Sequence, residues 1–142
     1  MKQEYYLKFN DYVENPKNLP SVSGIYLIRK TKRKNDGTLS VELLYVGKAE
    51  NLNDRFSDPN KHEGYVKAQK LCSNSKDNSY VSISYAECPK NSLDRVEACL
   101  IYTSKPKLNT FNTKTFDYDA TTVYVGGIRK SSLDNINVAQ KK

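Results

Sequence analysis

The chain has 142 residues and a hydrophobic content of 37%, enough for one compact domain with one modest core. Its 23 lysines and arginines exceed its 16 aspartates and glutamates, and the formal net charge of +7 favours a polyanionic partner. No apolar stretch has the length of a signal peptide or a membrane span, so we expect a soluble, cytoplasmic protein without a membrane partner. The three cysteines form no CxxC pair, which argues against a zinc or redox motif and favours reduced thiols.

Residues 1–22 are polar and punctuated by prolines, and their aromatic residues have the spacing of one short helix. Two β-branched and aromatic runs follow at residues 24–28 and 41–46. They predict a β-hairpin, because the connection between them contains the turn signal Asn-Asp-Gly at residues 35–37. Residues 1–22 are therefore interpreted as an N-terminal arm that precedes a hairpin.

Five basic residues cluster between the two runs. They are Arg29, Lys30, Lys32, Arg33 and Lys34. A charge run in a hairpin connection is usually a solvated loop, although it could equally grip a nucleic-acid backbone. All five are therefore retained as candidates for contact with DNA.

The pattern becomes helical after residue 47, with Asn51 or Asn53 as a cap, and a second helical stretch is expected over residues 61–72. An alternation of period two over residues 81–86 predicts a half-buried strand. This strand is expected to join the hairpin in one sheet.

A further helix is predicted from Ser92, its cap, to the proline at position 106. Residues 121–128 predict one more strand, and the polar composition of residues 129–142 is typical of a disordered tail. Within the helix, Glu97 lies four residues from both Leu93 and Ile101, which places it on or beside the buried face. An unpaired buried carboxylate is costly, so a partner or a metal must offset its charge.

Five motifs occur in an order typical of one nuclease family. They are Gly24-Ile25-Tyr26, Tyr45-Val46-Gly47-Lys48-Ala49, Asn51-Leu52 followed by Arg55, Glu97 within residues 96–101, and Lys105-Pro106-Lys107-Leu108-Asn109. Together they closely resemble the GIY-YIG nuclease family over residues 23–109. Val46 replaces the isoleucine of the second motif, as in many members. The stretch from Tyr45 to Phe56 is especially similar to the N-terminal nuclease domain of the bacterial excision-repair incision protein.

The resemblance implies an α/β domain, more narrowly α+β, with a small, mainly antiparallel sheet flanked by helices in the order β-β-α-α-β-α. We place this nuclease domain at residues 23–112, between the N-terminal arm at 1–22 and a C-terminal extension at 113–142 that carries one strand. The implied activity is hydrolysis of DNA phosphodiester bonds by an endonuclease that uses one Mg²⁺ or Mn²⁺ ion. DNA is the expected partner.

Five side chains receive roles from this resemblance. Glu97 would be the metal ligand, because its carboxylate is a hard oxygen donor. Arg55 would bind the scissile phosphate through its planar donors. Tyr26 is the candidate for activating water, with Tyr45 as the alternative. A phenol with a pKa near 10 needs a nearby cation for that role, and Lys48 could supply it or could simply contact phosphate.

The remaining site residues are expected to be structural. Gly47 would permit a tight strand-to-helix turn or a close approach of phosphate, and Gly24 would open the first strand. Asn109 would brace the site through hydrogen bonds or form a plain turn. Many family members carry a His or Tyr four positions after the arginine, where this chain has Pro59. The single histidine, His62, comes seven positions after it and is interpreted as a surface residue, with DNA contact as the alternative.

Several alternatives stay open. The same core serves restriction, homing, repair and transposon-related nucleases, and the sequence does not distinguish between these roles. It does not indicate an oligomeric state either. The fold could bind DNA or RNA without cutting, although a metal carboxylate beside the core argues against this. The motif matches could be accidental in a basic scaffold protein. A separate protein could also deliver the domain to its target.

Overall fold

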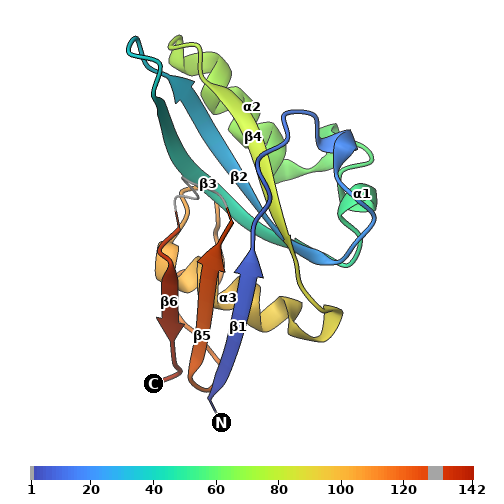
Figure 1. Ribbon diagram of the computed structural model, residues 1–142, viewed down its shortest axis with the longest axis vertical. Coiled ribbons are helices and arrows are strands. Elements are labelled where there is room, and N and C mark those ends of the chain that lie inside the picture. Colours follow the sequence, from blue (N-terminus) through green and yellow to red (C-terminus); the bar gives the residue numbers. More distant parts are fainter. Residues whose placement is uncertain (1, 128–132) are drawn as a thin grey trace.

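The computed structural model describes residues 2–127 and 133–142, and two three-stranded sheets dominate it (Figure 1). The first sheet has the strand order β3-β2-β4 and is antiparallel throughout. Its strands are β2 (Gly24–Arg33), β3 (Leu39–Ala49) and β4 (Tyr80–Glu87). The second sheet has the order β1-β5-β6, and its strands are β1 (Gln3–Lys8), β5 (Thr121–Gly126) and β6 (Ile136–Ala139). In this second sheet β1 runs parallel to β5, and β6 runs antiparallel to it.

Three α-helices flank the first sheet. They are α1 (Leu52–Arg55), α2 (Glu63–Ser75) and α3 (Leu93–Ser104), and the short 3-10 turns are η1 (Pro16–Asn18), η2 (Pro59–Lys61) and η3 (Lys90–Ser92). Helix α2 packs against β2 and β4, whereas α3 contacts the first sheet as well as β5 and β6 of the second. The order β2-β3-α1-α2-β4-α3 confirms the α+β class with a mainly antiparallel sheet. No helix in the described part of the chain is long and apolar enough to cross a membrane.

Strand β2 supplies side chains to two cores, one on each face of the first sheet. Ile25 and Leu27 pack into the core that includes α3, while Tyr26 and Ile28 pack into the core that includes α1 and α2. Successive side chains of a strand point to opposite faces, so a strand covered on both sides must be apolar at consecutive positions. This explains the unbroken apolar run at the start of β2.

The helix expected in the N-terminal arm is wrong, because residues 3–8 form strand β1. Exposure alternates along this strand, with Leu7 buried and Tyr6 74% exposed. The partner that stabilises it is β5, which pairs Gln3 with Thr121. Such a distant partner leaves no trace in local spacing, and tertiary pairing overrides the local pattern.

The C-terminal strand expected over residues 121–128 is confirmed as β5, although residue 128 lies outside the described residues. The interpretation of residues 129–142 as a disordered tail is wrong for residues 136–139, which form β6; residues 129–132 lie outside the described part. The inward Asn137 of β6 is buried and donates to the Val123 carbonyl at 3.3 Å. The N-terminal arm and the C-terminal extension therefore meet in one sheet.

The solvated loop expected between the hairpin strands is also wrong for residues 29–33, which continue β2. Arg29 is 1% exposed, and its guanidinium carbon lies 5.1 Å from the centre of the Tyr12 ring. Lys30 pairs with Asp77 at 3.6 Å. Arg29 therefore does not belong to an exposed basic surface, because the strand register turns its side chain inward.

The helix caps agree with expectation in part. Asn51 caps α1 by accepting from the Asp54 backbone N–H at 3.1 Å, whereas the Asn53 amide donates to the Leu19 carbonyl at 2.8 Å. The Ser92 hydroxyl, expected to cap α3, donates instead to Asn91 at 3.3 Å.

Candidate active site

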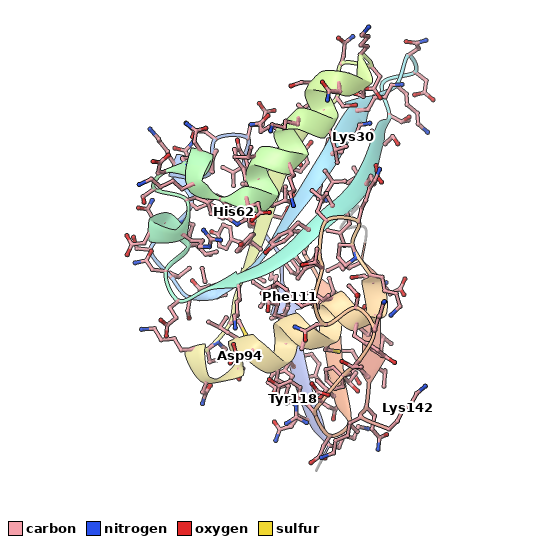
Figure 2. All side chains as sticks on the ribbon, turned by 180° about the vertical axis from the view of Figure 1, so that it is seen from behind. Lys30, His62, Asp94, Phe111, Tyr118 and Lys142 are labelled. Carbon is pink, nitrogen blue, oxygen red and sulfur yellow. The ribbon has the colours of Figure 1, made fainter. Side chains whose placement is uncertain are left out.

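The side chains expected to act on a phosphodiester come from separate elements and meet beside β3. Tyr26 lies on β2, Tyr45 on β3, Arg55 at the end of α1 and Glu97 on α3. Arg55 and Glu97 both influence the pKa values of the two tyrosines, so each of these charged groups lies within electrostatic reach of both phenols. Figure 2 shows the region, with β3 crossing between the labelled His62 and the start of α3.

The two phenols lie on one face of the hairpin. Tyr26 is opposite Gly47 across the strand pair, and Tyr45 is opposite Ile28. The ring centroids of the two tyrosines are 6.2 Å apart, with an interplanar angle of 28°. The register shifts by one residue next to this pair, and β-bulges of this kind re-aim side chains near active sites.

Gly47 lets Tyr26 lie flat across β3. A Cβ at Gly47 would come within 2.8 Å of Tyr26 Cε1 and closer still to Cζ and Oη. The expected role of Gly47 in a strand-to-helix turn is therefore wrong, because this glycine lies inside β3 and makes room for the ring. A Cβ at Gly24 would meet the Ala86 carbonyl of β4, so this glycine permits close pairing of β2 and β4.

His62 is part of the site, and its interpretation as a surface residue is wrong. It is 1% exposed, its Nε2 lies 2.6 Å from Tyr26 Oη, and its ring stacks on Phe56 with centroids 4.8 Å apart. The turn η2 lies between Arg55 and His62 and brings the chain back towards the sheet. Pro59, which begins this turn, is the feature of the sequence that indicated a longer spacing between Arg55 and His62.

The hydrogen bonds of His62 assign its tautomer. Its Nδ1 accepts from the Tyr65 backbone N–H at 3.1 Å, which caps α2. A neutral imidazole that accepts at Nδ1 carries its hydrogen on Nε2, so His62 donates to Tyr26 Oη. Burial, with Arg55 adding to it, lowers the pKa of His62 to about 4, which keeps the ring neutral near pH 7. The Tyr26 hydroxyl hydrogen is consequently left for another acceptor.

Opposing influences act on the Tyr26 phenol. Burial raises its pKa well above the ordinary value, and the nearby Tyr45 and Glu97 raise it further. The Arg55 guanidinium lowers the pKa through its charge and a hydrogen bond. The cation beside Tyr26 is therefore Arg55, rather than the lysine that the sequence suggested.

Lys48 lies on the other side of the site. Its ammonium forms an ion pair with the exposed Asp94, one helical turn before Glu97. The Lys48 backbone N–H is hydrogen-bonded to the Glu97 carboxylate. Tuning of Tyr26 by Lys48 thus has no support in this geometry, whereas contact of Lys48 with phosphate remains a prediction.

The Glu97 carboxylate is 7% exposed, and its charge is poorly compensated. The pKa of Glu97 is raised to about 7, because burial and the nearby Asp94 together outweigh the lowering influence of the Lys48 ammonium and backbone N–H. The described residues contain no group of three or more His, Cys, Asp or Glu side chains that could hold an ion. One hard carboxylate nevertheless fits Mg²⁺, which keeps several waters and often uses one or two protein carboxylates.

Asn109 braces β3 between the two motif residues Tyr45 and Gly47. Its carboxamide donates to the Val46 carbonyl and accepts from the Val46 N–H, both at 2.9 Å. The side chain is buried and substitutes for the backbone of a neighbouring strand. Bracing is therefore its observed structural role, alongside a backbone turn in which its N–H donates to Pro106.

No protein-family model, curated protein or solved structure matches this chain. The geometry described above is thus the evidence for a function.

Proposed function

We propose that this protein is an endonuclease of the GIY-YIG type that hydrolyses DNA phosphodiester bonds with one Mg²⁺ or Mn²⁺ ion. The observation that supports the proposal best is the meeting of a tyrosine, a guanidinium and a buried carboxylate from three elements. Phosphodiester hydrolysis needs an activated water, donors to the phosphoryl oxygens and compensation of charge on the leaving oxygen. The site offers one group for each requirement.

Arg55 binds the scissile phosphate in this proposal. Its side chain is exposed at the end of α1 while its guanidinium reaches the buried Tyr26, so it bridges solvent and site. A guanidinium stays charged at any relevant pH, and its planar donors match two phosphate oxygens. The phosphate is thereby held beside the Tyr26 hydroxyl.

In this proposal Tyr26 first loses its hydroxyl proton to a solvent water and then, as a phenolate, receives the proton of the attacking water. His62 and Arg55 both donate towards its oxygen, and such donors favour a phenolate. The negative charge of Glu97 raises the pKa of Tyr26. A cation that compensates this charge would therefore make loss of the Tyr26 proton easier. Tyr45 is half-buried and is the alternative base. Tyr26 is preferred because the 2.6 Å hydrogen bond of His62 is made to Tyr26.

Glu97 is the residue that would hold the cation, which when bound supplies charge compensation for the leaving oxygen. The chain's own contribution is to bury this residue, which is 7% exposed, and to favour the charged form of its carboxyl through the ammonium and the backbone N–H of Lys48.

The test is cleavage of supercoiled plasmid and of labelled duplexes by wild type, Glu97→Gln and Arg55→Gln, with Mg²⁺, with Mn²⁺ and with EDTA. We expect metal-dependent nicking or cutting that falls by about a hundredfold or more in both variants. Glu42→Gln, an exposed glutamate on the same β3, is the matched control and should cut like wild type.

Two outcomes would overturn the proposal. Equal cleavage by Glu97→Gln and wild type would point to a contaminating nuclease. DNA retardation without cleavage of plasmid, duplex, branched or single-stranded DNA would favour a binding module of the same fold.

A further inference from the structure

Strand β1 has one edge free. One edge pairs with β5, and within residues 2–127 and 133–142 no strand pairs with the other. Figure 1 shows β1 as the outer strand of the second sheet. An unpaired strand edge is a template for another strand, and natural proteins usually blunt it with a proline, a bulge or a charge. The six residues of β1 contain no proline, their pairing with β5 continues without a register shift, and their two charges, on Glu4 and Lys8, are of opposite sign.

The backbone of β1 shows which groups face this edge. Gln3 N–H donates to the Ala120 carbonyl at 2.9 Å, and Phe9 N–H donates to the Gly126 carbonyl at 2.8 Å. Both bonds point towards β5, and backbone groups alternate along a strand. The N–H and C=O groups of Glu4, Tyr6 and Lys8 therefore point to the free edge.

The side chains of the same three residues share the outer face of the sheet. Glu4, Tyr6 and Lys8 are exposed, whereas Leu7 between them is buried. Tyr6 is the most exposed large hydrophobic residue described, at 74%, and its ring stacks on Tyr124 with centroids 4.7 Å apart. The free edge thus carries an acid, an aromatic ring and a base, evenly spaced.

We propose that β1 pairs with β1 of a second copy of this chain, antiparallel about a two-fold axis at Tyr6. In this register Tyr6 lies opposite Tyr6 of the second copy, and Glu4 lies opposite its Lys8. The three edge-facing residues form hydrogen-bonded pairs, because all their backbone groups point at the partner strand. Charge selects this arrangement: a parallel in-register pairing would set Glu4 against Glu4 and Lys8 against Lys8, which is destabilising.

The symmetry of the charges favours a second copy as the occupant. A two-fold axis requires an interface that is complementary to itself, and one strand meets this requirement because Glu4 and Lys8 lie two residues on either side of Tyr6. The free edge ends after Lys8, because the Asn10 N–H donates to the Tyr85 carbonyl of β4 at 3.0 Å. The result is one six-stranded sheet that joins two chains.

Disulfide trapping tests the register. Paired Cα atoms in a hydrogen-bonded antiparallel pair are about 5.5 Å apart, a separation that a disulfide spans. Tyr6→Cys should therefore form a covalent dimer on mild oxidation. Glu4→Cys is the matched control and should not, because its two cysteines would be more than about 13 Å apart. A mixture of Glu4→Cys and Lys8→Cys chains should cross-link, and the native Cys72, Cys88 and Cys99 are buried.

Charge exchange tests the pairing without oxidation. Sedimentation should give wild type a mass of about 32 kDa at high concentration, against 16.2 kDa for one chain. Glu4→Lys and Lys8→Glu should each weaken the dimer by about tenfold or more, and the double variant Glu4→Lys/Lys8→Glu should restore it. Recovery in the double variant excludes misfolding as the cause. A wild type that stays monomeric at every accessible concentration, or single variants that dimerise like wild type, would overturn the proposal.

This inference does not depend on nuclease activity, because every readout above is an association or a cross-link.

Discussion

The imidazole of His62 and the phenol of Tyr26 share a 2.6 Å hydrogen bond inside the core that α1 and α2 build on the first sheet. The same imidazole caps α2 through Tyr65. One side chain thus couples the start of a helix to the oxygen that we propose as the base. Protonation of His62 at Nδ1 would break the cap.

Stability should consequently depend on this histidine at acidic pH. The folded pKa of about 4 lies below the ordinary 6.5, so the unfolded chain binds more protons between these values. The contribution is complete above about pH 6.5 and is lost as pH falls towards 4, and it amounts to about 3 kcal/mol. Denaturant unfolding of wild type and His62→Asn across this range should show a flatter pH dependence in the variant. Parallel curves would contradict the lowered pKa of His62.

Glu97→Gln should stabilise the protein in metal-free buffer. The folded pKa of about 7 exceeds the ordinary 4.5, so the carboxyl favours folding below pH 4.5 and this contribution is lost as pH rises to 7. At pH 8 the variant should unfold at higher denaturant concentration, by a free energy on the order of 3 kcal/mol. Glu42→Gln should unfold like wild type. Addition of Mg²⁺ should stabilise wild type and leave Glu97→Gln unchanged; a less stable Glu97→Gln at pH 8 would count against a strained carboxylate.

Gly47→Ala should displace the Tyr26 ring. The added Cβ would overlap Tyr26, and overpacking of this kind costs about 1 to 3 kcal/mol. Gly126→Ala is the control, because a Cβ there meets open space in the described structure. Thermal unfolding should give Gly47→Ala a lower melting temperature than Gly126→Ala. A Gly47→Ala variant as stable as wild type would mean that the Tyr26 ring can adopt another position without loss of stability.

Asn109→Ala should loosen the end of β3. It leaves the Val46 N–H and C=O without their side-chain partners, at a cost of about 2 to 3 kcal/mol. Asn35→Ala, at the exposed hairpin tip, should cost little. Hydrogen exchange should rise at Val46 in the first variant, and unchanged protection there would argue against the brace.

The hairpin, α2, β4 and α3 were predictable because each has a strong local period, and the motif order brought Tyr26, Tyr45, Arg55 and Glu97 to one place. His62 was missed because its distance from Arg55 along the chain depends on a short turn. Strands β1 and β6 were missed because each is defined by its pairing with β5, which a local pattern does not report. Arg29 was misplaced because the length of β2, and not its charge, decides which way the side chain points.

The second sheet also carries a consequence for how the chain reaches its fold. Helix α3, which carries Glu97, packs on one side against the hairpin and on the other against β5 and β6. Part of its cover therefore comes from β5 and β6, and β5 is paired in turn with β1. A fragment cut to residues 23–112 would keep every motif side chain and expose the apolar side of the helix that holds the carboxylate.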